Sequence, residues 1–228
     1  MPDRSPVWLS LQTAGLATCL VIPIGTIIAW WLAHGRSSAI KDAVRAALAL
    51  PLVLPPIVVG YYLLLVFGRG TSLGRWVNDV VGLQLMFTWQ GAAVAAAVMA
   101  LPLYTIAASA ALAEVDQGML EAGRTLGADE IQLALKVVVP IAYRGLLAGA
   151  TLAFARALGE FGATLMVAGS IPGRTQTLPL ALYAAVIAGK EEEARRWTAL
   201  LSALAIGLVG SVAIYQRHVA ASRGERRR

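Results

Sequence analysis

The sequence is poor in cysteine and in charge, and both shortages narrow what the chain can be. It has one cysteine, Cys19, among 228 residues, which excludes an intramolecular disulfide and a cysteine-based metal site. Charged residues make up 14% of the chain and hydrophobic residues 58%, and the mean hydropathy is +0.69. An ordinary soluble domain is about 25% charged. The composition therefore predicts a membrane protein.

Nucleotide-binding and catalytic patterns are also missing. The sequence has no Gly-x-x-x-x-Gly-Lys-Ser/Thr stretch, since the glycines at 70 and 74 are followed by Arg75. Without a phosphate-cradling loop and its lysine, the chain cannot be an ATPase of that type. It also lacks a catalytic pair of carboxylates, a nucleophile–base pair and a His-Glu-x-x-His sequence. We therefore expect no catalytic residue, no metal site and no cofactor.

The net charge of +6 raises the alternative of nucleic-acid binding. Five of the arginines, however, lie in the segment 217–228, directly after an apolar run. Basic residues beside a membrane span are typical of a cytoplasmic anchor. The charge distribution therefore indicates contact with membrane lipid and no nucleic-acid partner.

Apolar blocks of about twenty residues or more, the length needed to cross a bilayer, indicate an all-α polytopic membrane protein with about five membrane helices. The first block is too long for the apolar region of a signal peptide and precedes no convincing cleavage site, so we expect it to remain as a membrane helix. The predicted spans are residues 7–33, 43–67, 85–112, 137–167 and 197–215.

Two of these spans have internal features with structural consequences. The second contains Pro51, Pro55 and Pro56, and each proline removes a backbone donor, so a kinked or partly unwound helix is predicted. The fourth carries small residues at four-residue spacing, which predict a close-packing stripe. These residues are Gly145, Gly149 and Ala153.

The distribution of lysine and arginine predicts the orientation. With the N-terminus on the periplasmic side, eleven of these residues are cytoplasmic and seven are outside, as the positive-inside rule favours. The C-terminus and the loop 113–136 are then cytoplasmic. The apolar stretch 177–189, within the segment 170–190, is too short to span and is predicted to be a re-entrant or periplasmic gate segment. A sixth span there is the alternative.

The loop 113–136 has its own helix signals. Asp116 is placed to cap a short helix, and Gly127 is suited to end it in a left-handed conformation. Asp129 is placed to cap a second helix. The face of the second helix that is expected to lie against the membrane domain carries Ile131, Leu135 and Val138.

The spacing within this loop resembles the EAA loop of bacterial ABC importer permeases. That loop reads Glu-Ala-Ala, three residues, Gly, nine residues, Ile, one residue, Leu-Pro; here valines replace Ile and Leu, and a glycine replaces the second Ala. The resemblance implies a coupling segment that docks on an ATPase subunit, whereas an ordinary amphipathic loop is the alternative. The residues that carry the resemblance to a coupling segment are Glu121, Ala122, Gly123, Gly127 and Pro140.

Three further stretches, 50–60, 155–164 and 171–179, resemble the molybdate permeases of the ABC importers, and the likeness extends over residues 8–215. It implies a MetI-like ABC importer transmembrane domain in the bacterial inner membrane. It also implies a homodimer, two copies of an ATPase subunit and a periplasmic oxyanion-binding protein. A sulfate, thiosulfate or tungstate permease is the nearer alternative, and an ATP-independent carrier is the more distant one.

Arg156 and Glu160 lie four residues apart in the fourth span, where a charge is costly unless it faces protein or water. Arg156 could attract a passing oxyanion, or the two residues could form a structural ion pair. The prolines of the second span could likewise open backbone groups toward a pore or make a packing kink. The candidate pathway residues are Pro55, Pro56, Arg156, Glu160 and Thr164.

Overall fold

The computed structural model describes residues 5–225 except 35, 36, 81 and 83, with the backbone alone for 209 and 212–225. This part of the chain forms helices, turns and loops and contains no strand. The helices are α1 Pro6–Ala33, α2 Ala39–Val53, α3 Pro56–Phe67, α4 Ser72–Val80, α5 Trp89–Ala113, α6 Gln117–Thr125, α7 Glu130–Leu133, the π-helical η1 Ala134–Val138, α8 Val139–Leu158, α9 Gly162–Ala168, α10 Leu178–Ile187 and α11 Glu191–Glu225.

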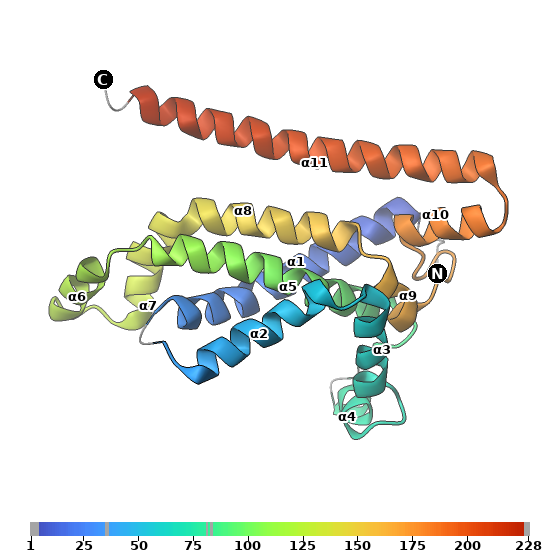
Figure 1. Ribbon diagram of the computed structural model, residues 1–228, viewed down its shortest axis with the longest axis horizontal. Helices are drawn as coiled ribbons and strands as arrows, with labels where there is room; N and C mark the ends of the chain where they lie inside the picture. The colour runs from blue at the N-terminus through green and yellow to red at the C-terminus, as the bar shows by residue number, and fades with distance from the viewer. Residues whose placement is uncertain (1–4, 35–36, 81, 83, 226–228) are drawn as a thin grey trace.

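The centre of the bundle is formed by α1, α5 and α8, which lie side by side (Figure 1). Small residues let these helices approach closely. A Cβ atom built on Gly145 would lie 2.3 Å from the Cβ of Ala111 on α5, and one on Gly149 would lie 3.2 Å from the Cβ of Ala107. With Ala153 fully buried, the predicted close-packing stripe of α8 is confirmed.

Helix length and hydropathy identify the segments able to cross a membrane. Among the described residues, α1, α5 and the continuous helix Glu130–Leu158 are each long and apolar enough, and α2 with α3 qualifies only as a bent pair. The predicted fifth span falls within α11, but part of it lies among residues whose side chains are outside the description. The all-α polytopic prediction is confirmed, and the span boundaries remain predictions.

The predicted second span is interrupted more sharply than a kink. Helices α2 and α3 meet at 116°, with Leu54 and Pro55 between them. Prolines at 55 and 56 have no N–H to continue the hydrogen-bond ladder of α2. Helix α3 therefore turns away from the bundle (Figure 1) and does not continue along the axis of α2.

The predicted fourth span is also interrupted, since α8 ends at Leu158 and α9 begins at Gly162. The segment 170–190 holds α10, a short apolar helix that packs against α1 and α11. Its first N–H, on Leu178, donates to Ser10 Oγ at 2.7 Å in a buried contact. The re-entrant or periplasmic placement of this segment remains a prediction.

Candidate functional site

Helix α6 and the turn after it have the caps that the sequence predicts. Asp116 Oδ1 accepts hydrogen bonds from the N–H groups of Gly118 and Met119, at 2.7 and 3.2 Å. Gly127 has φ +84°, the left-handed region in which glycine carries no steric cost. The Ala128 N–H then donates to Gly123 O at 3.0 Å, which satisfies a carbonyl at the end of the helix.

The second helix also starts as predicted, since Asp129 Oδ1 accepts from the Gln132 N–H at 2.7 Å. An ion pair joins the two helices across the turn: Arg124 Nε donates to Glu130 Oε1 at 2.7 Å, and its Nη2 donates to Oε2 at 3.2 Å. The hydrogen bond from Arg124 lowers the pKa of the Glu130 carboxyl, and the same bond raises the pKa of Arg124. This two-point pair links the two helices on the exposed side of the turn.

Buried apolar residues anchor the loop to the bundle. Leu120 of α6 is 1% exposed and Leu133 of α7 is 2% exposed. A Cβ on Gly123 would lie 2.4 Å from Leu133 Cδ2, so Leu133 packs directly against Gly123. We therefore attribute Gly123 to packing within the chain, while Ala122 is exposed.

One prediction about this loop is wrong for two of its three residues. The residues expected to lie against the membrane domain were on one helical face, but Ile131 and Leu135 are 72% and 64% exposed. Val138, the third predicted residue, is buried as expected, and Leu133, which the prediction did not include, is buried as well. The reason is η1, which widens the helix between α7 and α8 and changes the face that each residue occupies. Pro140 lies at the first turn of α8, and its missing N–H leaves the Lys136 carbonyl without its α-helical partner.

The surface that the loop offers to a partner is partly apolar. Leu126 is 87% exposed and Met119 is 52% exposed, while Glu121 adds an exposed carboxylate. The exposed outer side of the loop thus combines apolar side chains with a charged one. The loop packs against the bundle on its inner side and is exposed on its outer side.

The second group of candidate residues surrounds the break between α8 and α9. Arg156 Nη1 lies 2.8 Å from Glu160 Oε2, and the side chains are 25% and 1% exposed. The other carboxylate oxygen, Oε1, accepts from the Ala163 N–H at 2.8 Å. Glu160 therefore has both oxygens occupied, one by the ion pair and one by the first turn of α9.

The two helix breaks pack against each other. A Cβ on Gly162 would lie 3.0 Å from Pro56 Cβ and from the Ile57 nitrogen. A Cβ on Gly60 of α3 would lie 2.8 Å from Ala163 Cα. The structure therefore brings Pro56 and the Glu160 corner into one site.

The remaining pathway candidates lie around this site. Thr164 is buried on α9 at 1% exposure, whereas Pro55 is exposed between α2 and α3. The role of these residues in a transport pathway remains a prediction.

Comparison with known families decides the class of protein. Residues 22–222 match the family described as the inner membrane component of binding-protein-dependent transport systems. That match covers most of the chain. The chain belongs to this family.

Members of this transport family with close sequences support the resemblance found in the motifs. The chain is 41% identical over 206 residues to the molybdenum transport system permease protein ModB of Escherichia coli strain K12, covering 90% of each chain. It is 38% identical over 195 residues to the ModB of Haemophilus influenzae, covering 85% of each. As a member of the inner membrane component family, it is a multi-pass inner-membrane protein.

Solved structures confirm the MetI-like fold of this transport family member. A chain of the inward-facing MetNI methionine ABC transporter aligns with a TM-score of 0.67 and 22% identity, covering 93% of both chains. An amino acid ABC transporter aligns with a TM-score of 0.61 and 17% identity, covering 93% of this chain and 91% of that one. At such identities the likeness establishes the fold.

The sequence interpretation did not predict two features of this loop. The Arg124–Glu130 pair was absent from the interpretation, although opposite charges on either side of a glycine turn are a readable signal. Leu133 was missed as an anchor because the π-helical turn displaces the apolar face from its α-helical register.

Proposed function

We propose that the chain is the permease subunit of an ATP-driven molybdate importer. The substrate is proposed because the chain is 41% and 38% identical to permeases named for molybdenum transport, over most of their length. The observations that support ATP coupling are the loop geometry and the membership in a binding-protein-dependent family.

In this proposal two copies of the chain form one pathway, and each binds an ATPase subunit through α6. The N-terminus is periplasmic, which places α6 in the cytoplasm, and a periplasmic oxyanion-binding protein delivers the substrate at the other end. Closure of the ATPase dimer on ATP draws the two α6 helices together, and the bundles reopen outward. Hydrolysis resets the assembly to the inward-facing state.

The attachment of α6 to the bundle supports its role in transmitting motion. A coupling element must move with its bundle, and the buried Leu120 and Leu133 attach the loop to the bundle, while the Arg124–Glu130 pair joins its two helices. Docking on the ATPase then uses the bare outer side, where Glu121 and Leu126 are exposed. The exposed Leu126 supplies apolar area, and Glu121 supplies a charge that sets orientation.

The helix break of α2 supports the proposed pathway. The carbonyls of Pro51 and Leu52 would bond to the nitrogens of residues 55 and 56 in a continuous helix, and both of those are prolines. Leu52 and Pro55 are nevertheless exposed. Backbone groups without partners are tolerated in a membrane where they face protein or water, so this face lines the pathway or the second copy.

Arg156 and Glu160 fit a point of passage for an oxyanion better than a tight binding site. The pair is close to neutral because each charge offsets the other. A weak attraction allows the anion to enter and leave, whereas an unpaired arginine in a narrow pathway would slow its release. Substrate selection then rests mainly with the binding protein.

The experiment that tests the function is reconstitution with the ATPase and binding-protein partners in proteoliposomes. ATP hydrolysis should rise with binding protein loaded with molybdate. A larger rise with sulfate, thiosulfate or tungstate would reassign the substrate and leave the coupling intact. Uptake that proceeds without any ATPase subunit would overturn the coupling and favour an ATP-independent carrier.

A further inference from the structure

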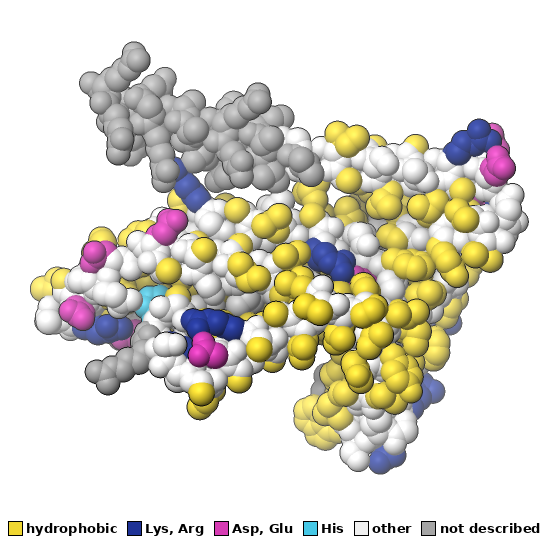
Figure 2. Space-filling model, in the orientation of Figure 1, with side chains coloured by type: hydrophobic (Ala, Val, Ile, Leu, Met, Phe, Trp, Pro, Cys, Tyr) yellow, Lys and Arg dark blue, Asp and Glu magenta, His cyan; other side chains and the backbone are white. Residues whose placement is uncertain are grey.

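Residues 56–80, comprising α3 and α4, form an arm that stands out from the bundle (Figure 1). Helix α3 has 12 residues and α4 has 9, and a bilayer crossing needs about 20. Figure 2 shows hydrophobic side chains over much of the arm and Lys or Arg side chains at its edge. The arm therefore carries exposed apolar surface on two helices that are each too short to cross a bilayer alone.

Helix α4 is divided into two faces. At 100° per residue, Leu73, Trp76 and Val80 share one face, and they are 43%, 54% and 67% exposed. The opposite face is polar and is also exposed. It carries Arg75, Asn78 and Asp79. A short helix with one exposed apolar face and one exposed polar face suits a boundary between an apolar medium and water.

The corner between α3 and α4 sets the orientation of these faces. Thr71 Oγ1 donates to the carbonyls at the end of α3, with Gly68 O at 2.8 Å, and accepts from the Gly74 N–H at 2.9 Å. A Cβ on Gly74 would lie 2.1 Å from Gly68 O, so only glycine allows this contact. Helix α4 is thereby fixed to α3 and does not swing freely.

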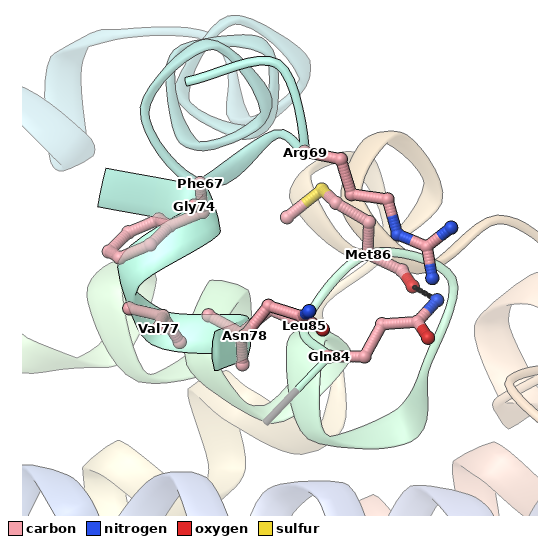
Figure 3. Close-up of a pocket in the computed structure, with 8 residues that line it drawn as sticks. All are labelled: Phe67, Arg69, Gly74, Val77, Asn78, Gln84, Leu85 and Met86. Carbon is pink, nitrogen blue, oxygen red and sulfur yellow. Dashed lines mark hydrogen bonds between the residues drawn. The ribbon is translucent and has the colours of Figure 1, made fainter. Parts of the chain in front are cut away.

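The inner side of α4 closes a hollow of about 10 Å³, with room for about one water. Figure 3 shows Asn78 and Val77 of α4 on one side of it and Gln84 and Met86 on the other. Residues 84–86 lie a few residues before the start of α5, whose other end leads to α6. Helix α4 therefore lies at the end of the bundle away from the coupling loop.

We propose that α4 lies in the lipid–water interface at this end of the bundle. Its apolar face would enter the acyl-chain boundary, and Arg75 would reach the lipid phosphates. Tryptophan and arginine are residues that favour this zone. Arg69 and Arg75 outnumber the single acid Asp79 on the exposed end of the arm, which complements the negative phosphates. The placement does not depend on which anion is transported.

The test is spin-label accessibility in the full-length chain in proteoliposomes. On a Cys19→Ser background, single cysteines replace Leu73, Trp76 or Val80 on one face and Arg75 or Asn78 on the other. Residue 106, an exposed position within α5, provides the hydrocarbon reference, and residue 195, exposed on α11, provides the aqueous one. Two or more sites on each face keep the test decisive if one variant expresses poorly.

The expected result is a reversal between the faces. Labels on the apolar face should collide with oxygen more than with a water-soluble nickel chelate, and labels on the polar face should show the opposite ratio. Equal aqueous accessibility on both faces would overturn the proposal. Low accessibility to both reagents with spin–spin broadening would also overturn it, because it would show that a second copy covers α4.

Discussion

Glu160 Oε2 lies 2.8 Å from Arg156 Nη1, while Oε1 of the same carboxylate accepts a hydrogen bond from the Ala163 N–H. One buried side chain thus ties the end of α8 to the start of α9. The break that these helices make is packed on the break between α2 and α3. Loss of this tie should therefore disturb two elements at once.

Glu160→Ala should reduce folded protein, since it removes the ion pair and the bond to Ala163 together. Breaking a buried pair by removing one partner costs about 3–5 kcal/mol, and the partial exposure of Arg156 places the cost at the lower end. Glu160→Gln should cost less, because its amide oxygen can still accept from Ala163. Thermal unfolding of the purified variants measures both, and equal stability of Glu160→Ala and wild type would show that the tie is unimportant.

Arg156→Gln separates a packing role from a pathway role. If the arginine attracts the oxyanion, ATP-driven uptake should fall several-fold in a protein that accumulates normally. The measurement is initial uptake rate per folded complex. Unchanged uptake would remove Arg156 from the pathway and leave the structural ion pair as its role.

Gly60→Ala should weaken the packing of α3 on α9. The added Cβ would lie 2.8 Å from Ala163 Cα and 2.9 Å from its carbonyl oxygen, and overpacking of this kind costs about 1–3 kcal/mol. Gly15→Ala is the matched control, since the space around a Cβ at that position of α1 is open to 4 Å. A melting temperature that falls equally in both variants would contradict the close packing at Gly60.

The Arg124–Glu130 pair should make the order of the coupling loop depend on pH. The pKa of Glu130 is lowered in the folded chain, so its contribution is present above the ordinary glutamate pKa and is lost as pH falls through the lowered value. The protection factors of the amides at residues 126–128, which are corrected for the intrinsic pH dependence of exchange, should fall over that range in wild type. In Glu130→Gln the exchange should be fast already and should lack this pH-dependent step; a step of the same size in the variant would exclude the pair as its cause.

Glu121→Ala should uncouple transport without unfolding the chain. Glu121 is exposed, and the bonds that shape the loop come from Asp116, Gly127 and Arg124. ATP-driven uptake should fall at least several-fold, with wild-type thermal stability. Glu114→Ala, an exposed acid just before α6, should leave uptake unchanged. Equal uptake in both variants would argue against docking through Glu121.

How far the sequence predicts the structure depends on the range of the interactions involved. The caps at Asp116 and Asp129 and the left-handed Gly127 are set by neighbours within a few residues, and they were predicted correctly. The close-packing stripe of α8 was likewise readable from spacing.

The features that the sequence did not predict are set by tertiary contacts. Pro55 and Pro56 predicted an interruption of the second span, but the 116° angle between α2 and α3 follows from the packing of α3 on α9. The buried face of the second loop helix depends on a π-helical turn beside Pro140, which periodicity at 3.6 residues cannot show. The family resemblance supplied the function that these local signals could not.

The most direct test of the central claim is site-specific photo-cross-linking from position 126 in the assembled complex. Leu126 is 87% exposed on the coupling loop, and a photoreactive residue there should capture the ATPase subunit. The same probe at position 187, which is exposed at the end of α10, should not capture it, because α10 lies at the opposite end of the bundle from α6 (Figure 1). Capture of the ATPase from position 187, or none from position 126, would contradict the proposal that α6 couples this permease to its motor.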